Sequence, residues 1–168
     1  MPNHSASNPR IRNLIGNDFT ITTFSALDLD IQASVAWLMS NDGGAWSDAF
    51  SPSEMLFEQF KESYSQFQKA FIKAYGCERL GFVTLDAKAL MECVMQDPDV
   101  EDAETWEEAA EILMSYFPDE AVPDTSFPVI LFDDEDQTLQ DGWPRLCRNL
   151  QAGAQKIEAM FFPDSFGL

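Results

Sequence analysis

The chain of 168 residues contains one histidine, His4, in a polar segment near its start. Histidine-activated serine or cysteine nucleophiles and two-histidine zinc proteases are therefore excluded. The three cysteines, Cys77, Cys93 and Cys147, form no CxxC pair, so a zinc site would lack ligands. Gly43-Gly44 has neither the spacing nor the lysine of a phosphate-binding loop. No motif of this kind fixes a reaction, and we expect no catalytic residues and no cofactor.

The cysteine number is odd, which argues against a disulfide framework and predicts a reducing, cytoplasmic location. No stretch approaches 18 apolar residues, so no membrane-spanning helix is expected. Residues 1–16 begin with a polar run containing two prolines, and we expect them to form a disordered leader.

Basic residues are also scarce, with ten lysines and arginines against 29 acids and a net charge of −19. Seventeen of the acids lie between Asp86 and Asp136, where Lys88 is the only base, so this segment has a net charge of −16. Such a charge repels nucleic acids and anionic membranes, and it attracts cations or a basic protein surface. Direct binding to nucleic acid or to a membrane is therefore not expected.

Apolar residues make up 45% of the chain and include 14 phenylalanines and four tryptophans, a composition typical of a folded domain. The patterns predict strands at 19–24, 81–85, 127–132, 138–140 and 157–162, and helices at 31–39, 52–75, 86–95, 103–117 and 143–152. This order predicts an α+β fold, with a helix-rich N-terminal half packed on a small mixed sheet in the C-terminal half. Residues 17–79 and 80–168 are expected to form these two parts within one compact unit.

One predicted helix carries a continuous apolar stripe. Its members follow one another at intervals of three or four residues: Leu56, Phe60, Tyr64, Phe67, Phe71 and Ala74. Ser51 and Pro52 are typical of the start of this helix, and Gly76 is typical of its end. The simplest interpretation is a buried core face, and the alternative is an aromatic face that binds a partner.

Residues 138–162 contain Asp141-Gly142-Trp143-Pro144-Arg145, then a predicted helix, a glycine and an apolar strand. This segment resembles the signature of the ParB/sulfiredoxin-like superfamily, in which a strand ends in Asp-Gly-x-His-Arg-Leu before a helix. With the upstream strands, the resemblance covers roughly residues 80–162.

The resemblance implies a turn, Asp141-Gly142, that offers backbone N–H groups to a phosphate, and an Arg145 that binds it. In this chain Pro144 stands where the family has its histidine, and Trp143 stands where sulfiredoxin-type chemistry needs cysteine. We therefore expect the scaffold without full catalysis, and we expect Arg145 to pair with a local carboxylate such as Asp133 or Asp134.

The acidic segment supplies the candidate partner-binding residues. They comprise a stripe at helical spacing with its preceding turn, and a predicted hairpin turn: Glu101, Asp102, Glu104, Glu107, Glu108, Glu111, Asp133, Asp134, Glu135 and Asp136. The outline of an EF-hand from Asp97 to Glu108 has Asp102 where the turn needs glycine, so no calcium site is expected. A cation held by the hairpin turn and Asp141 remains an alternative to a solvated turn.

The hypothesis that follows is a non-catalytic acidic interaction protein. Its acidic segment would dock on a basic surface of a nucleic-acid-binding protein, as do DNA-mimic inhibitors and immunity proteins of phages and plasmids. The alternative is a nucleotide-binding or phosphate-processing domain of the ParB/sulfiredoxin-like type, with Asp141, Gly142 and Arg145 at the phosphate.

Overall fold

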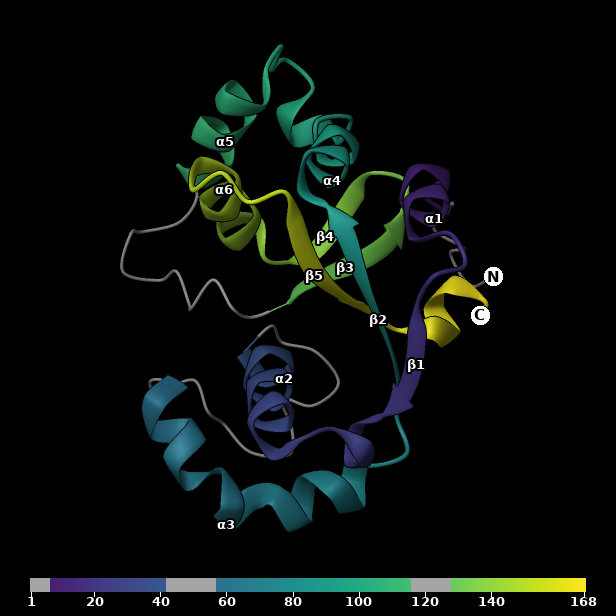
Figure 1. Cartoon of the computed structure of the whole chain (residues 1–168), viewed down its shortest axis with the longest axis vertical. Coiled ribbons are helices and arrows are strands. Elements are labelled where there is room, and N and C mark those ends of the chain that lie inside the picture. Colours follow the sequence, from purple (N-terminus) through teal and green to yellow (C-terminus); the bar gives the residue numbers. More distant parts are fainter. Residues whose placement is uncertain (1–6, 42–56, 116–127) are drawn as a thin grey trace. The chain divides into compact units, whose positions relative to one another are not determined.

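The computed structural model describes residues 7–41, 57–115 and 128–168 (Figure 1). The chain divides into two compact units. Unit 1 comprises residues 1–20 and 81–168, and unit 2 comprises residues 21–80. The predicted helix start at Ser51-Pro52, together with Leu56, Phe117 and Phe127, lies outside the described residues.

A five-stranded mixed sheet has the order β1-β2-β5-β3-β4. The strands are β1 (Thr20–Thr23), β2 (Arg79–Asp86), β3 (Val129–Asp134), β4 (Gln137–Asp141) and β5 (Lys156–Phe161). β2 is antiparallel to β5, β5 is parallel to β3, and β3 forms an antiparallel hairpin with β4. Burial alternates along β2, as expected for a strand whose one face packs on a core.

Four α-helices of unit 1 cover this sheet: α1 (Pro9–Ile15), α4 (Ala87–Val94), α5 (Trp106–Met114) and α6 (Trp143–Gln151). α4, α5 and α6 lie side by side in Figure 1, and α6 contacts both of the others. Side-chain caps set the first turns of α1, α4 and α5. The Asp86 carboxylate accepts from the Ala89 N–H at 2.8 Å, and the Thr105 hydroxyl accepts from the Glu108 N–H at 3.2 Å.

The core of unit 1 lies between these helices and the sheet. It contains Leu90 and Val94 of α4, Leu113 of α5 and Leu146 of α6, each almost completely buried. Trp106 is half-buried and packs against this core from the first position of α5. The first turn of α5 is therefore held both by its cap and by an aromatic anchor.

Unit 2 contains α2 (Leu29–Asn41), α3 (Phe57–Tyr75) and the short 3-10 helix η1 (Phe24–Ala26). Phe60, Tyr64 and Phe71 of α3 are fully buried, whereas Phe67 is half-buried and Ala74 is exposed. The Tyr64 hydroxyl donates to the Gln32 side-chain oxygen of α2 at 2.9 Å. The predicted apolar stripe is therefore a core face along part of its length.

The predicted disordered leader is wrong for residues 9–15, which form α1. Asn8 is its N-cap and accepts from the Ile11 N–H at 3.2 Å, Pro9 occupies the first turn, and Ile11 and Ile15 are buried. The signals were present in the sequence: an Asn-Pro helix start and two isoleucines four residues apart. The polar composition of the preceding residues obscured them.

The predicted α+β class is confirmed, and each of the ten predicted elements has a counterpart in the described residues. The helix-rich N-terminal half is supported in part, because α4, α5 and α6 add helices to the second half. The sequence placed the division between the two parts at residues 79 and 80, and in the structure the chain passes between the two units after Thr20 and again after Leu80.

Candidate functional site

The acids of unit 1 fall into two groups that the sequence could not separate. Asp97, Asp133 and Asp141 each form an ion pair with an arginine. The acids of the turn before α5 and of α5 itself are exposed. The first group stabilises the fold, whereas the second remains available to a partner.

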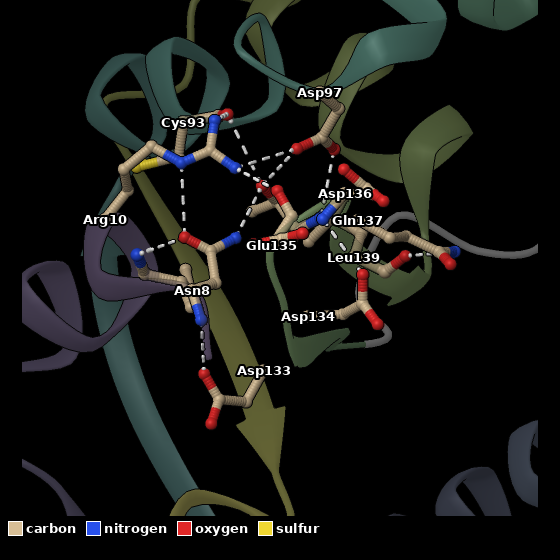
Figure 2. A network of polar contacts seen from close by, with 12 residues as sticks. Asn8, Arg10, Cys93, Asp97, Asp133, Asp134, Glu135, Asp136, Gln137 and Leu139 are labelled. Atoms are coloured by element: carbon tan, nitrogen blue, oxygen red, sulfur yellow. Dashed lines mark hydrogen bonds and ion pairs between the residues drawn. The ribbon is translucent and has the colours of Figure 1, made fainter. Parts of the chain in front are cut away.

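Asp133, at the end of β3, binds the N-terminal segment. Its carboxylate, with 6% of the side chain exposed, forms a bidentate ion pair with the Arg12 guanidinium. It also accepts from the Asn8 backbone N–H at 2.8 Å (Figure 2). Hydrogen bonding to Asp133 raises the pKa of Arg12, so the guanidinium stays charged. Although the sequence placed Asp133 among the partner-binding acids, in the structure it holds α1 to the sheet.

Asp97 lies in a second polar network beside the first (Figure 2). Only 2% exposed, it accepts from the Thr138 N–H at 2.9 Å and the Thr138 hydroxyl at 2.7 Å. Arg10 reaches the same carboxylate at 3.4 Å and donates to the Cys93 and Glu135 carbonyls. Asp97, the first residue of the EF-hand outline, therefore has a structural role, because it connects α1, the end of α4 and β4.

Burial raises the pKa of Asp97 above its ordinary value of 3.8, although Thr138 and Arg10 act in the opposite direction. Because the folded state favours the protonated carboxyl, the stability contributed by Asp97 is fully present below the unfolded pKa. It is lost as the pH rises through the folded pKa.

We therefore expect the unfolding free energy of the wild type, relative to Asp97→Asn, to fall as the pH rises above about 4. Urea denaturation followed by NMR signals of unit 1 measures it, and carbon-13 titration gives the Asp97 pKa directly. A carboxyl that titrates below 3.8 would show that the bonds from Thr138 and Arg10 outweigh burial.

The Asp141-Gly142 turn joins β4 to α6, as the motif predicts, and Pro144 lies in the first helical turn. The buried Arg145 side chain donates to the Asp141 carboxylate at 2.9 Å and to the Pro128 carbonyl at 3.0 Å. Arg145 therefore pairs with a local carboxylate, as predicted, but its partner is Asp141. The predicted partners Asp133 and Asp134 do not fill this role in the structure.

Gly142 shows how closely this turn is packed. Its φ is +109°, and a Cβ there would lie 2.8 Å from the Arg145 Nη2 and 2.8 Å from a Val129 methyl carbon. Any other residue would be strained in this conformation and would collide with both neighbours. The arginine thus lies against the turn, where the family resemblance implies a phosphate.

The acids of the second group are exposed on and just before α5: Glu101, Asp102, Glu104, Glu107, Glu108 and Glu111. Glu107 and Glu108 lie in the first turn, where the helix dipole favours carboxylates. Glu108 also accepts from the Glu104 N–H at 2.9 Å. The hairpin turn adds the exposed Glu135 and Asp136, while Asp134 is half-buried and accepts from the Asp136 N–H. The two sets are carried by different elements.

Two hollows adjoin the acidic helix face, and sequence reasoning missed both. The larger, of about 630 Å³, is lined by Asp86, Lys88, Trp106, Glu107, Leu150 and the loop 153–156. The smaller, of about 310 Å³, is lined by Lys88, Glu92, Met95, Glu104 and Trp106. Trp106 and Lys88 line both, so we call the pair of hollows the Trp106 groove. The sequence signal was a tryptophan near the start of the predicted helix 103–117, with Glu104 and Glu107 on either side of it.

Among the residues that the structure describes, no group of three or more His, Cys, Asp or Glu side chains could hold a metal ion. This also holds for the hairpin turn and Asp141, the group that the sequence offered as an alternative cation site. Asp133 and Asp141 bind arginines instead. In the same part of the chain, every helix is too short or too polar to cross a membrane.

The chain matches no family model, no curated protein and no solved structure.

Proposed function

We propose that this chain is a non-catalytic interaction protein whose acidic α5 face docks on a basic surface of another protein. The observation that carries the proposal is the division of the acids. Asp97, Asp133 and Asp141 are paired with arginines, whereas six exposed carboxylates at residues 101–111 have no ion pair with a described residue.

An uncompensated patch of this kind carries a cost. Carboxylates three and four residues apart on a helix repel one another, and each such pair destabilises the helix by about 0.2–0.5 kcal/mol. Dipole interactions offset this at Glu107 and Glu108 but not at Glu111, which lies beyond the first turn. A partner with clustered lysines or arginines, such as a nucleic-acid-binding protein, would relieve the repulsion and be steered toward this face.

The proposal predicts that partner binding depends steeply on salt. Proteins captured by the immobilised chain at about 50 mM salt should be largely lost at about 500 mM, where the Debye length falls to a few ångströms. Capture by a variant with Glu104, Glu107, Glu108 and Glu111 changed to glutamine should already be weak at low salt. Partners that stay bound at high salt, or that bind the variant equally, would place the interface elsewhere.

The second candidate is the nucleotide-binding domain implied by the ParB/sulfiredoxin-like resemblance. The strand-to-helix turn at Gly142 and the position of Arg145 in α6 favour it. Against it, Arg145 is 1% exposed and already bonded to Asp141 and Pro128, and Pro144 removes a backbone donor from the turn. A phosphate would have to displace the Asp141 carboxylate.

Calorimetry with ATP, CTP and ADP, with and without magnesium, separates the two candidates. We expect no binding tighter than about 100 μM, or about −5.5 kcal/mol, because Arg145 is occupied. Nucleotide binding tighter than about 100 μM would put the nucleotide-binding function first, provided that Asp141→Asn strengthens the binding and Arg145→Lys removes it.

A further inference from the structure

We propose that the Trp106 groove is the site at which the acidic face captures an arginine side chain of its partner, with the guanidinium stacked on the Trp106 indole. This inference rests on the proposed function, since it names the chemical group that the acidic face recognises. It adds a preference for arginine over lysine that depends on the Trp106 ring as well as on the carboxylates.

The position of Trp106 is the first reason. The indole is half-buried and packed against the core of unit 1, and it borders a hollow on each side. The Thr105 cap fixes the first turn of α5, so the ring is held in place before a partner arrives. A partly exposed, preorganised tryptophan beside a hollow is typical of the residues that dominate binding energy at interfaces.

Charge around the ring is the second reason. Four carboxylates line the groove: Asp86, Glu92, Glu104 and Glu107. Among the residues that the structure describes, Lys88 and Lys156 are the lysines that line it, and Glu108 and Glu111 continue the negative charge along α5. An aromatic face surrounded by carboxylates suits a planar cation, because the guanidinium can stack on the ring while its N–H groups donate to the carboxylates.

Lys88 gives the proposal a sharp consequence. It lines both hollows and is exposed, so it adds a positive charge near the region that an incoming guanidinium must enter. Removing this charge should strengthen arginine binding. Lys69 in α3 of unit 2 is also exposed and is not among the residues that line the groove, and Lys69→Gln changes the net charge by the same amount.

The test uses two capped peptides of equal charge, hexa-arginine and hexa-lysine, with the full chain at about 50 mM salt. The Trp106 indole N–H signal, assigned by its loss in Trp106→Phe, reports on the groove. We expect hexa-arginine to move this signal and to bind about threefold or more tighter than hexa-lysine. Lys88→Gln should tighten hexa-arginine binding at least threefold, whereas Lys69→Gln should change it less than twofold.

Trp106→Leu keeps apolar packing against the core but removes the aromatic face. It should abolish the preference for hexa-arginine while leaving hexa-lysine binding nearly unchanged, and Trp106→Phe should retain part of the preference. Circular dichroism establishes that each variant is folded.

Equal binding of both peptides to the wild type and to Trp106→Leu would contradict the proposed arginine site in the groove. The proposal that the acidic face docks on a basic surface would still stand. Binding of neither peptide would overturn both proposals. If pyrophosphate moves the Trp106 signal, and Lys88→Gln removes this effect, the groove takes an anion and the proposal is wrong.

Discussion

Phe60→Ala should destabilise unit 2 by about 3–5 kcal/mol, as truncation of a buried phenylalanine does elsewhere. Phe60 is fully buried, with its ring centroid 5.8 Å from that of Tyr64 and 6.4 Å from that of Phe71. The cavity would therefore open inside an aromatic cluster that also includes Phe24, whose ring lies 6.4 Å from Phe71.

The second contribution is polar. The Tyr64 hydroxyl donates to Gln32, which is 1% exposed and in turn donates to the Phe24 carbonyl at 3.1 Å. Burial raises the pKa of Tyr64, as expected for a hydroxyl held away from water. Loss of the neighbouring ring would admit water to this network and loosen α3 from α2.

Hydrogen exchange of the α2 and α3 amides measures the effect, because global denaturation would mix the two units. Phe67→Ala is the matched control: the same substitution at a half-buried position of the same helix should cost clearly less. If Phe60→Ala costs under about 1 kcal/mol, the ring is not in a core, and the stripe would become a candidate binding face.

This helix also shows what periodicity can predict. The stripe from Phe60 to Phe71 correctly identified the buried face of α3, and Gly76 correctly ended it. Spacing could not show that Phe67 would be only half-covered and Ala74 exposed, because burial depends on which neighbouring elements cover each turn. Periodicity gives the direction of a face, whereas coverage is set by tertiary packing.

The limits are clearer at the candidate site. The exposed glutamate stripe followed from local spacing, and it is present in the structure. Local spacing could not predict that Asp97 and Asp133 pair with arginines, because these arginines are 87 and 121 residues away in the sequence. A charge count treats all acids alike, and only the fold shows which are neutralised.

The Trp106 groove could not be predicted for a related reason. Its lining comes from α4, α5, the end of α6 and the loop before β5, so no local pattern contains it. Lys88 appeared in the sequence only as the single base of an acidic segment. In the structure it lines both hollows, together with Trp106 and four carboxylates.

Reversing the α5 stripe should have the largest effect on binding. With Glu104, Glu107, Glu108 and Glu111 changed to lysine, we expect association with the partner captured by the wild type to slow by roughly 10- to 100-fold. Steering by opposite charges raises association rates over this range, and the change would replace attraction by repulsion. Stopped-flow or surface-based kinetics at two salt concentrations measures the rate.

The control must carry the same net charge. Changing Asp28, Asp30, Glu62 and Glu78 of unit 2 to lysine also raises the net charge from −19 to −11, and all four are exposed. If the α5 face is the interface, this second variant should slow association much less, with the difference shrinking at high salt. Equal slowing by both variants would show that only the total charge matters and that the α5 face is not the docking surface. Because lysine in the first turn of α5 opposes the helix dipole at a cost of about 0.3–1 kcal/mol per residue, circular dichroism must show both variants folded before the rates are compared.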